Sequence, residues 1–112
     1  MSELLRAAQA LVEASNGNAD GRTRLAMRNY AELVTFAPVD EILDMLEVVF
    51  AEDWMAMPPW ARNLAYRLAV LQRPDDAALL REAAADLFSF GPDWDPHAER
   101  LEEQAARLEE SN

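Results

Sequence analysis

The sequence contains no cysteine and no lysine, and each absence excludes familiar kinds of site. Without cysteine there is no disulfide, thiolate nucleophile, or cysteine-bound zinc or iron–sulfur centre. Without lysine there is neither a Schiff base nor a P-loop lysine, and the three glycines are too few for a glycine-rich phosphate loop. His97 is the only histidine, the residue type that most often serves as an acid or base in catalysis. We therefore predict that the protein is not an enzyme.

Positive charge is scarce. Ten arginines stand against 21 acidic residues, which leaves a formal net charge of −11 at pH 7. Phosphate backbones and anionic membrane surfaces repel such a chain, so we expect no nucleic acid or membrane as partner, whereas a basic protein is favoured. No apolar run approaches the ~20 residues of a spanning helix, and Glu3 precedes the first apolar stretch, unlike in a signal peptide. A cytoplasmic protein is expected.

The apolar residues predict an all-α fold. They recur at intervals of three and four between short breakers rich in Pro, Gly, Asn and Asp, and strand patterns are rare. The 112 residues suffice for one domain, which we predict to span 1–112. The breakers divide it into six helices, at about 2–15, 22–36, 38–53, 59–72, 74–90 and 96–110.

The chain also repeats itself with a period of about 38 residues. A shift of that length aligns the stretches 3–12, 41–50 and 79–88, with matching apolar columns along one helix face. Ala- and Leu-rich helices also align by chance, but here the breakers keep the same register. The predicted core comprises the apolar residues of these columns and of the intervening helices: Leu4, Ala8, Leu11, Ile42, Leu46, Val49, Phe50, Leu64, Leu68, Leu71, Leu80, Leu87 and Phe88.

Tight turns that contain Pro38 and Pro74 predict antiparallel helix hairpins over 22–53 and 59–90, with one unpaired helix at each end. The stretch 59–68, PWARNLAYRL, resembles the opening helix of a HEAT-like repeat, and the turn at 73–75 is similar as well. The resemblance covers about 22–110 and is best over 59–90. It implies a short α-solenoid with a binding role and no catalytic residues.

Two surfaces are candidates for a partner. Asp40, Asp44 and Glu47 fall at helical offsets of four and seven, and the repeat places Glu82 and Asp86 on the equivalent side of the next hairpin. This acidic stripe is either an ordinary solvated face or a docking strip for arginine and lysine side chains. Trp54 and Trp60, in a Met-rich loop, either cover the core or serve as apolar anchors at its edge.

Three functions compete. The favoured one is a non-catalytic module that docks a basic protein, in the manner of an inhibitor or immunity protein, without cofactor or metal. The alternative is a structural subunit of a helical homo- or hetero-oligomer, with exposed apolar surface on the unpaired first helix at Leu5, which shares a repeat column with Leu43. We therefore expect a monomer or a homodimer. The third is an enzyme that uses Asp93, Asp95 and His97. The spacing of these residues matches no established metal-binding motif, and capping of the last helix by Asp95 is the simpler interpretation.

Overall fold

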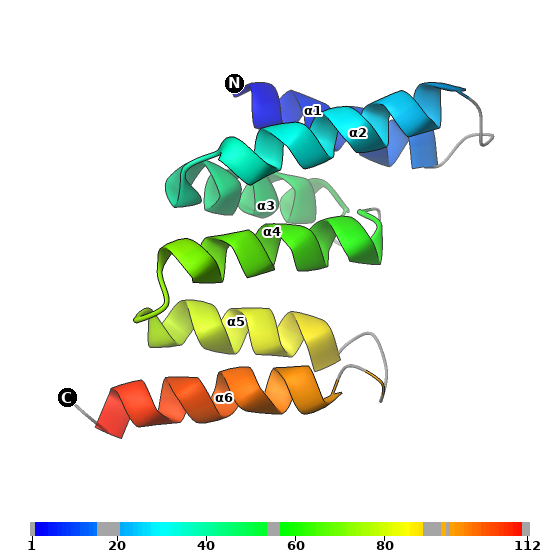
Figure 1. Cartoon of the computed structure of the whole chain (residues 1–112). Coiled ribbons are helices and arrows are strands. Elements are labelled where there is room, and N and C mark those ends of the chain that lie inside the picture. Colours follow the sequence, from blue (N-terminus) through cyan, green and yellow to red (C-terminus); the bar gives the residue numbers. More distant parts are fainter. Residues whose placement is uncertain (1, 16–20, 54–56, 89–92, 94, 111–112) are drawn as a thin grey trace.

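The computed structural model of the chain describes residues 2–15, 21–53, 57–88, 93 and 95–110 (Figure 1). These residues form six helices and no strand, so the predicted all-α class is confirmed. Each helix begins and ends within a few residues of its predicted bounds, because Pro, Gly and Asp interrupt the chain where the helices stop. The helices are α1 (Glu3–Ser15), α2 (Gly21–Phe36), α3 (Val39–Asp53), α4 (Pro59–Gln72), α5 (Ala77–Phe88) and α6 (Asp95–Glu110).

The helices lie side by side in an elongated pile that measures 48 × 30 × 22 Å (Figure 1). The most extensive packing joins α5 to α6 and α1 to α2. Helix α3 packs on α1 and α4, and α4 also contacts α2 and α5. The expected unpaired helix at each end is therefore wrong, and so is the packed hairpin over 22–53, because α2 and α3 make little contact. Turn length therefore does not decide which helices pack here: a tight turn joins α4 to α5, which pack together, and another joins α2 to α3, which hardly do.

Most of the predicted core is buried, including Leu4, Ala8, Leu11, Ile42, Leu46, Val49, Leu80 and Leu87, whereas Phe50, Leu64 and Leu68 are half-buried. Two predictions are wrong, because Leu71 is 70% exposed and Phe88 is exposed as well. Helix α4 buries the face that carries Ala61, Ala65 and Ala69, and Leu71 lies about 200° around the helix from Ala69.

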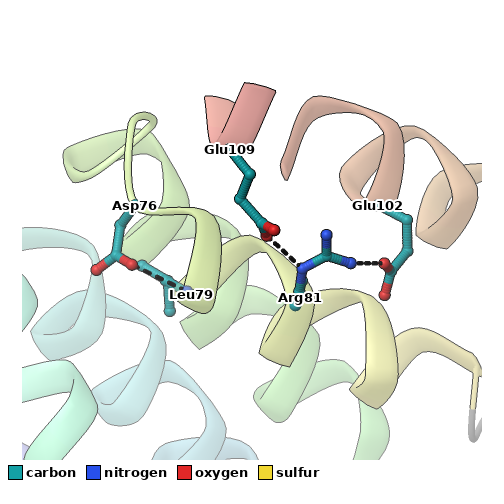
Figure 2. A network of polar contacts seen from close by, with 5 residues as sticks. All are labelled: Asp76, Leu79, Arg81, Glu102 and Glu109. Atoms are coloured by element: carbon teal, nitrogen blue, oxygen red, sulfur yellow. Dashed lines mark hydrogen bonds and ion pairs between the residues drawn. The ribbon is translucent and has the colours of Figure 1, made fainter. Parts of the chain in front are cut away.

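Polar side chains fix the ends and the packing of α5 (Figure 2). Asp76 caps its first turn, since Oδ1 accepts a hydrogen bond of 3.1 Å from the Leu79 backbone N–H. The sequence predicted a helix that begins at Pro74, but Pro74 lies in the turn before α5. Arg81 joins α5 to α6, because its guanidinium donates to Glu102 at 2.6 Å and to Glu109 at 2.7 Å.

Candidate functional site

Helix α3 presents the first part of the predicted acidic stripe. Its side chains include six acidic residues and no basic one. Asp40, Asp44 and Glu47 are all exposed, on the side of the helix away from its buried residues. Asp40 is paired with Arg73 at the end of α4. Asp44 and Glu47 make neither an ion pair nor a hydrogen bond within the described part of the chain, so both carboxylates are available to a partner.

The second part of the stripe does not form as expected. Glu82 is exposed on α5 and accepts a hydrogen bond of 3.2 Å from the Tyr66 hydroxyl. Asp86 is buried, with only 4% of its side chain accessible, and forms an ion pair with Arg62. Its predicted place on an exposed docking strip is therefore wrong. Asp86 lies on the buried face of α5, where a carboxylate is tolerated because an arginine neutralises it.

Arg62 and Asp86 belong to a cluster that ties α3, α4 and α5 together. The Arg62 guanidinium lies 4.7 Å from the centre of the Phe50 ring, which is 6.4 Å from the ring of Tyr66. Burial raises the pKa of the Asp86 carboxyl, and the positive charge of Arg62 opposes that shift without cancelling it. Burial also raises the pKa of the Tyr66 hydroxyl, and the negative charges nearby add to the effect. The cluster joins the three helices, and Tyr66 and Asp86 also line a pocket among α4, α5 and α6.

The predicted aromatic anchors have different outcomes. Trp60 begins the first turn of α4 and remains 38% exposed, so it is accessible at its edge. Its ring meets Tyr30 of α2 edge-on, with ring centres 5.8 Å apart, and the buried Tyr30 hydroxyl donates to the Ala61 carbonyl at 2.7 Å. Trp60 thus covers the contact between α2 and α4. Trp54 lies outside the described residues.

The residues of the enzyme hypothesis, Asp93, Asp95 and His97, lie at or just before the start of α6. His97 is exposed in the first turn of α6, and Asp93 is exposed before it. Within the described ranges, no group of three His, Asp or Glu side chains lies close enough together to hold a metal ion. Of the helices in this part of the chain, none has both the length and the apolar character needed to cross a membrane.

A hollow that the sequence reasoning missed lies where α1 begins, α2 ends and α3 begins. It has a volume of about 580 Å³ and is lined by Glu3, Leu4, Glu32, Leu33, Phe36, Ala37, Pro38 and Glu41. Phe36 is 87% exposed, more than any other large apolar residue in the described part of the chain. We call this feature the acidic hollow, because three carboxylates surround one exposed aromatic ring.

The carboxylates of the acidic hollow attract a cation. Glu3 and Glu41 lie in the first turns of α1 and α3 and bring two carboxylates to the hollow. Glu32 pairs with Arg28 one turn earlier, at 3.3 Å and largely exposed, so this contact exchanges readily with a competing cation. Glu3 and Glu41 have no ion pair within the described residues. An arginine or lysine of a partner can therefore contact the carboxylates of Glu3 and Glu41 and the aromatic ring of Phe36.

Comparison of the chain with known protein families, with curated protein sequences and with solved structures found no match.

Proposed function

We propose that the protein is a non-catalytic binding module that docks a basic protein. The docking surface consists of the acidic hollow and the adjoining Asp44 and Glu47 of α3. The observation that carries the proposal is the almost fully exposed Phe36 among the carboxylates of Glu3, Glu32 and Glu41. An inhibitor or immunity-type role belongs to the same proposal, as does the HEAT-like relationship, for which the stretch 59–90 is the support.

Charge and an aromatic ring serve different parts of this recognition. The net charge of −11 steers a basic partner toward the protein and raises its association rate. Each exposed ion pair then adds only about 0–1 kcal/mol, so carboxylates alone give weak binding. A buried aromatic anchor supplies much more, and a guanidinium over the face of Phe36 adds about 0.5–1 kcal/mol or more as water is excluded. The combination favours arginine-rich segments with apolar neighbours.

The test begins with affinity capture from the native cell at low and high salt, followed by binding kinetics with the captured basic protein. The double variant Glu41→Gln and Asp44→Asn should slow association and flatten its salt dependence, because it removes steering charge. Phe36→Ser should mainly speed dissociation, because it removes the anchor. These changes leave the core intact, since Phe36 and Asp44 are exposed and Glu41 is at the surface of the hollow.

Two matched controls separate the site from general effects. Leu25→Ser removes another exposed apolar side chain of α2, and Glu99→Gln removes an exposed acid of α6. Neither residue lines the acidic hollow. If Leu25→Ser speeds dissociation as much as Phe36→Ser, or the carboxylate variant keeps the association rate and salt slope of the parent, the proposed surface is wrong.

The alternative of an oligomer subunit has a specific basis, although not the expected one. Leu5 is buried, so the apolar surface predicted for α1 is not available. Exposed apolar side chains lie instead on α2 and α4, among them Leu25, Phe36 and Leu71. Light scattering over a range of protein concentrations distinguishes the two functions, because only a self-associating subunit increases in mass with concentration.

A further inference from the structure

A second pocket lies far along the pile, among α4, α5 and α6. It has a volume of about 440 Å³. Helices α4 and α6 both pack on α5 but not extensively on each other, so their side chains form two walls above a floor that α5 provides. Its lining includes the aliphatic residues Val70, Leu71, Ala83, Leu87 and Leu101, and also the Asp86 carboxylate, which Arg62 neutralises. This is the volume and mainly apolar character of a small-molecule site.

Two arginines reach the same pocket from opposite walls. Arg67 belongs to α4 and Arg100 to α6, and both side chains are exposed. Neither makes an ion pair or a hydrogen bond within the described residues. Five of the ten arginines form an ion pair with a carboxylate within the described residues: Arg28, Arg62, Arg73, Arg81 and Arg107. Two arginines that lack one and line a single apolar pocket provide a complement for a negative charge.

We propose that this pocket binds a small amphiphilic anion, which has one carboxylate or sulfonate group and an apolar body. The charged group takes hydrogen bonds from Arg67 and Arg100, while the apolar body lies against Leu87 and Leu101. The volume favours a small molecule over a docked helix, whose diameter of about 10 Å and several turns require a longer groove. The net charge of −11 repels a polyacidic peptide strongly, because every acidic residue of the peptide adds to the repulsion. A small molecule with a single negative charge is repelled much less. This site is separate from the acidic hollow and carries the opposite charge.

The probe is 8-anilinonaphthalene-1-sulfonate, whose fluorescence rises on entry into an apolar site, compared with N-phenyl-1-naphthylamine, which is the same molecule without the sulfonate. We expect one sulfonate dye per chain, bound at least about tenfold more tightly than the uncharged one, since each tenfold is about 1.4 kcal/mol. Dodecanoate should displace the dye, and dodecyltrimethylammonium, with the same chain and the opposite charge, should not.

Matched variants locate the site. The double variant Arg67→Gln and Arg100→Gln should weaken dye binding about tenfold or more, and Arg6→Gln with Arg24→Gln, an equal charge change at exposed arginines outside the pocket, should leave it unchanged. Leu71→Glu places a carboxylate at the pocket and should also weaken binding, whereas Leu25→Glu, an equally exposed leucine elsewhere, should not. Circular dichroism confirms that every variant is folded.

Several results would overturn the proposal: no saturable binding, several dyes per chain, equal affinity for the uncharged dye, or an equal loss in the Arg6 and Arg24 control. Displacement of the dye by a glutamate-rich amphipathic peptide but not by dodecanoate would also overturn it, in favour of a peptide-docking groove.

Discussion

Removal of one partner of the buried ion pair between Arg62 and Asp86 should destabilise the fold strongly, whereas removal of both should not. Asp86→Leu keeps the branched shape of the side chain but leaves a guanidinium in a site where only 10% of the Arg62 side chain is accessible. Loss of one partner of a buried pair costs about 3–5 kcal/mol. A domain of this size has about 5–15 kcal/mol of stability in total, so the variant should lose a large share of it.

Removing both partners should restore most of that loss. In the double variant Arg62→Met and Asp86→Leu no buried charge remains, and the methionine thioether retains a contact with the Phe50 ring. Apolar replacement of a buried pair is often neutral or stabilising by about 1–4 kcal/mol. The raised pKa of Asp86 points the same way, because it shows that the loss of hydration outweighs the attraction of Arg62. The double variant should therefore be more stable than either single variant.

Urea unfolding followed by far-UV circular dichroism measures these free energies, with Asp44→Asn as an exposed control that should change little. If Asp86→Leu does not fold, the double variant and Asp86→Asn still test the reasoning, since the amide oxygen can accept from Arg62. Equal destabilisation of the double variant and the more damaged single variant would refute it.

The same pair sets a pH dependence of known sign. The pKa of Asp86 is raised in the folded state, so its contribution to stability is fully present below the unfolded pKa, about 3.9, and is lost as pH rises through the folded value. Asp86→Asn does not titrate at this position. Its free energy of unfolding should therefore improve relative to that of the parent as pH rises from about 4 toward neutrality. If the free energies of unfolding of Asp86→Asn and the parent differ by the same amount at every pH in this range, the assigned direction of the Asp86 pKa shift is wrong.

Three further substitutions test the packing and the cap of α5 with the same unfolding assay. Leu46→Ala should cost about 2–5 kcal/mol, because its side chain is buried and leaves a cavity, whereas Leu71→Ala should change stability by about 0.5 kcal/mol or less. Similar costs at the two positions would contradict the observed burial. Asp76→Ala should lose about 0.5–2 kcal/mol with the cap of α5, and its neighbour Asp75, exposed in the same turn, is the control position.

The helices could be predicted from the sequence because their signals are local. A proline or glycine follows the ends of α1, α2, α4 and α5 within three residues, and the interval of three to four marks the buried face of a helix. Which helices pack together could not be inferred from turn length. A better indication was present in α1, where Leu4, Leu5, Ala7, Ala8 and Leu11 are all buried. Such a wide apolar arc indicates a helix covered from two sides, and α1 does contact both α2 and α3.

The candidate site could be predicted only in part, for a related reason. Asp44 and Glu47 were placed correctly on the exposed face of α3, since they lie opposite an apolar stripe. Asp86 was not, although it follows Leu79 and Ala83 at offsets of seven and three and so shares their buried face. Phe36 belongs to no motif in the sequence and was not predicted. Its angular position, well away from the buried stripe of α2, indicates exposure.

The net charge of −11 conceals a division of charge between neighbouring helices. Helix α3 has six acidic residues and no arginine, whereas α4 has Arg62 and Arg67 and no acid. A distant ligand is attracted or repelled by the net charge of the protein. Within about 8–10 Å, the screening length near physiological salt, the charges of the nearest side chains dominate. Added salt should therefore slow the association of a basic partner with the acidic hollow and speed that of an anion with the pocket of Arg67 and Arg100. Stopped-flow rates for both ligands at several salt concentrations measure these slopes. Slopes of the same sign would show that local charge, rather than the net charge of the protein, controls both encounters.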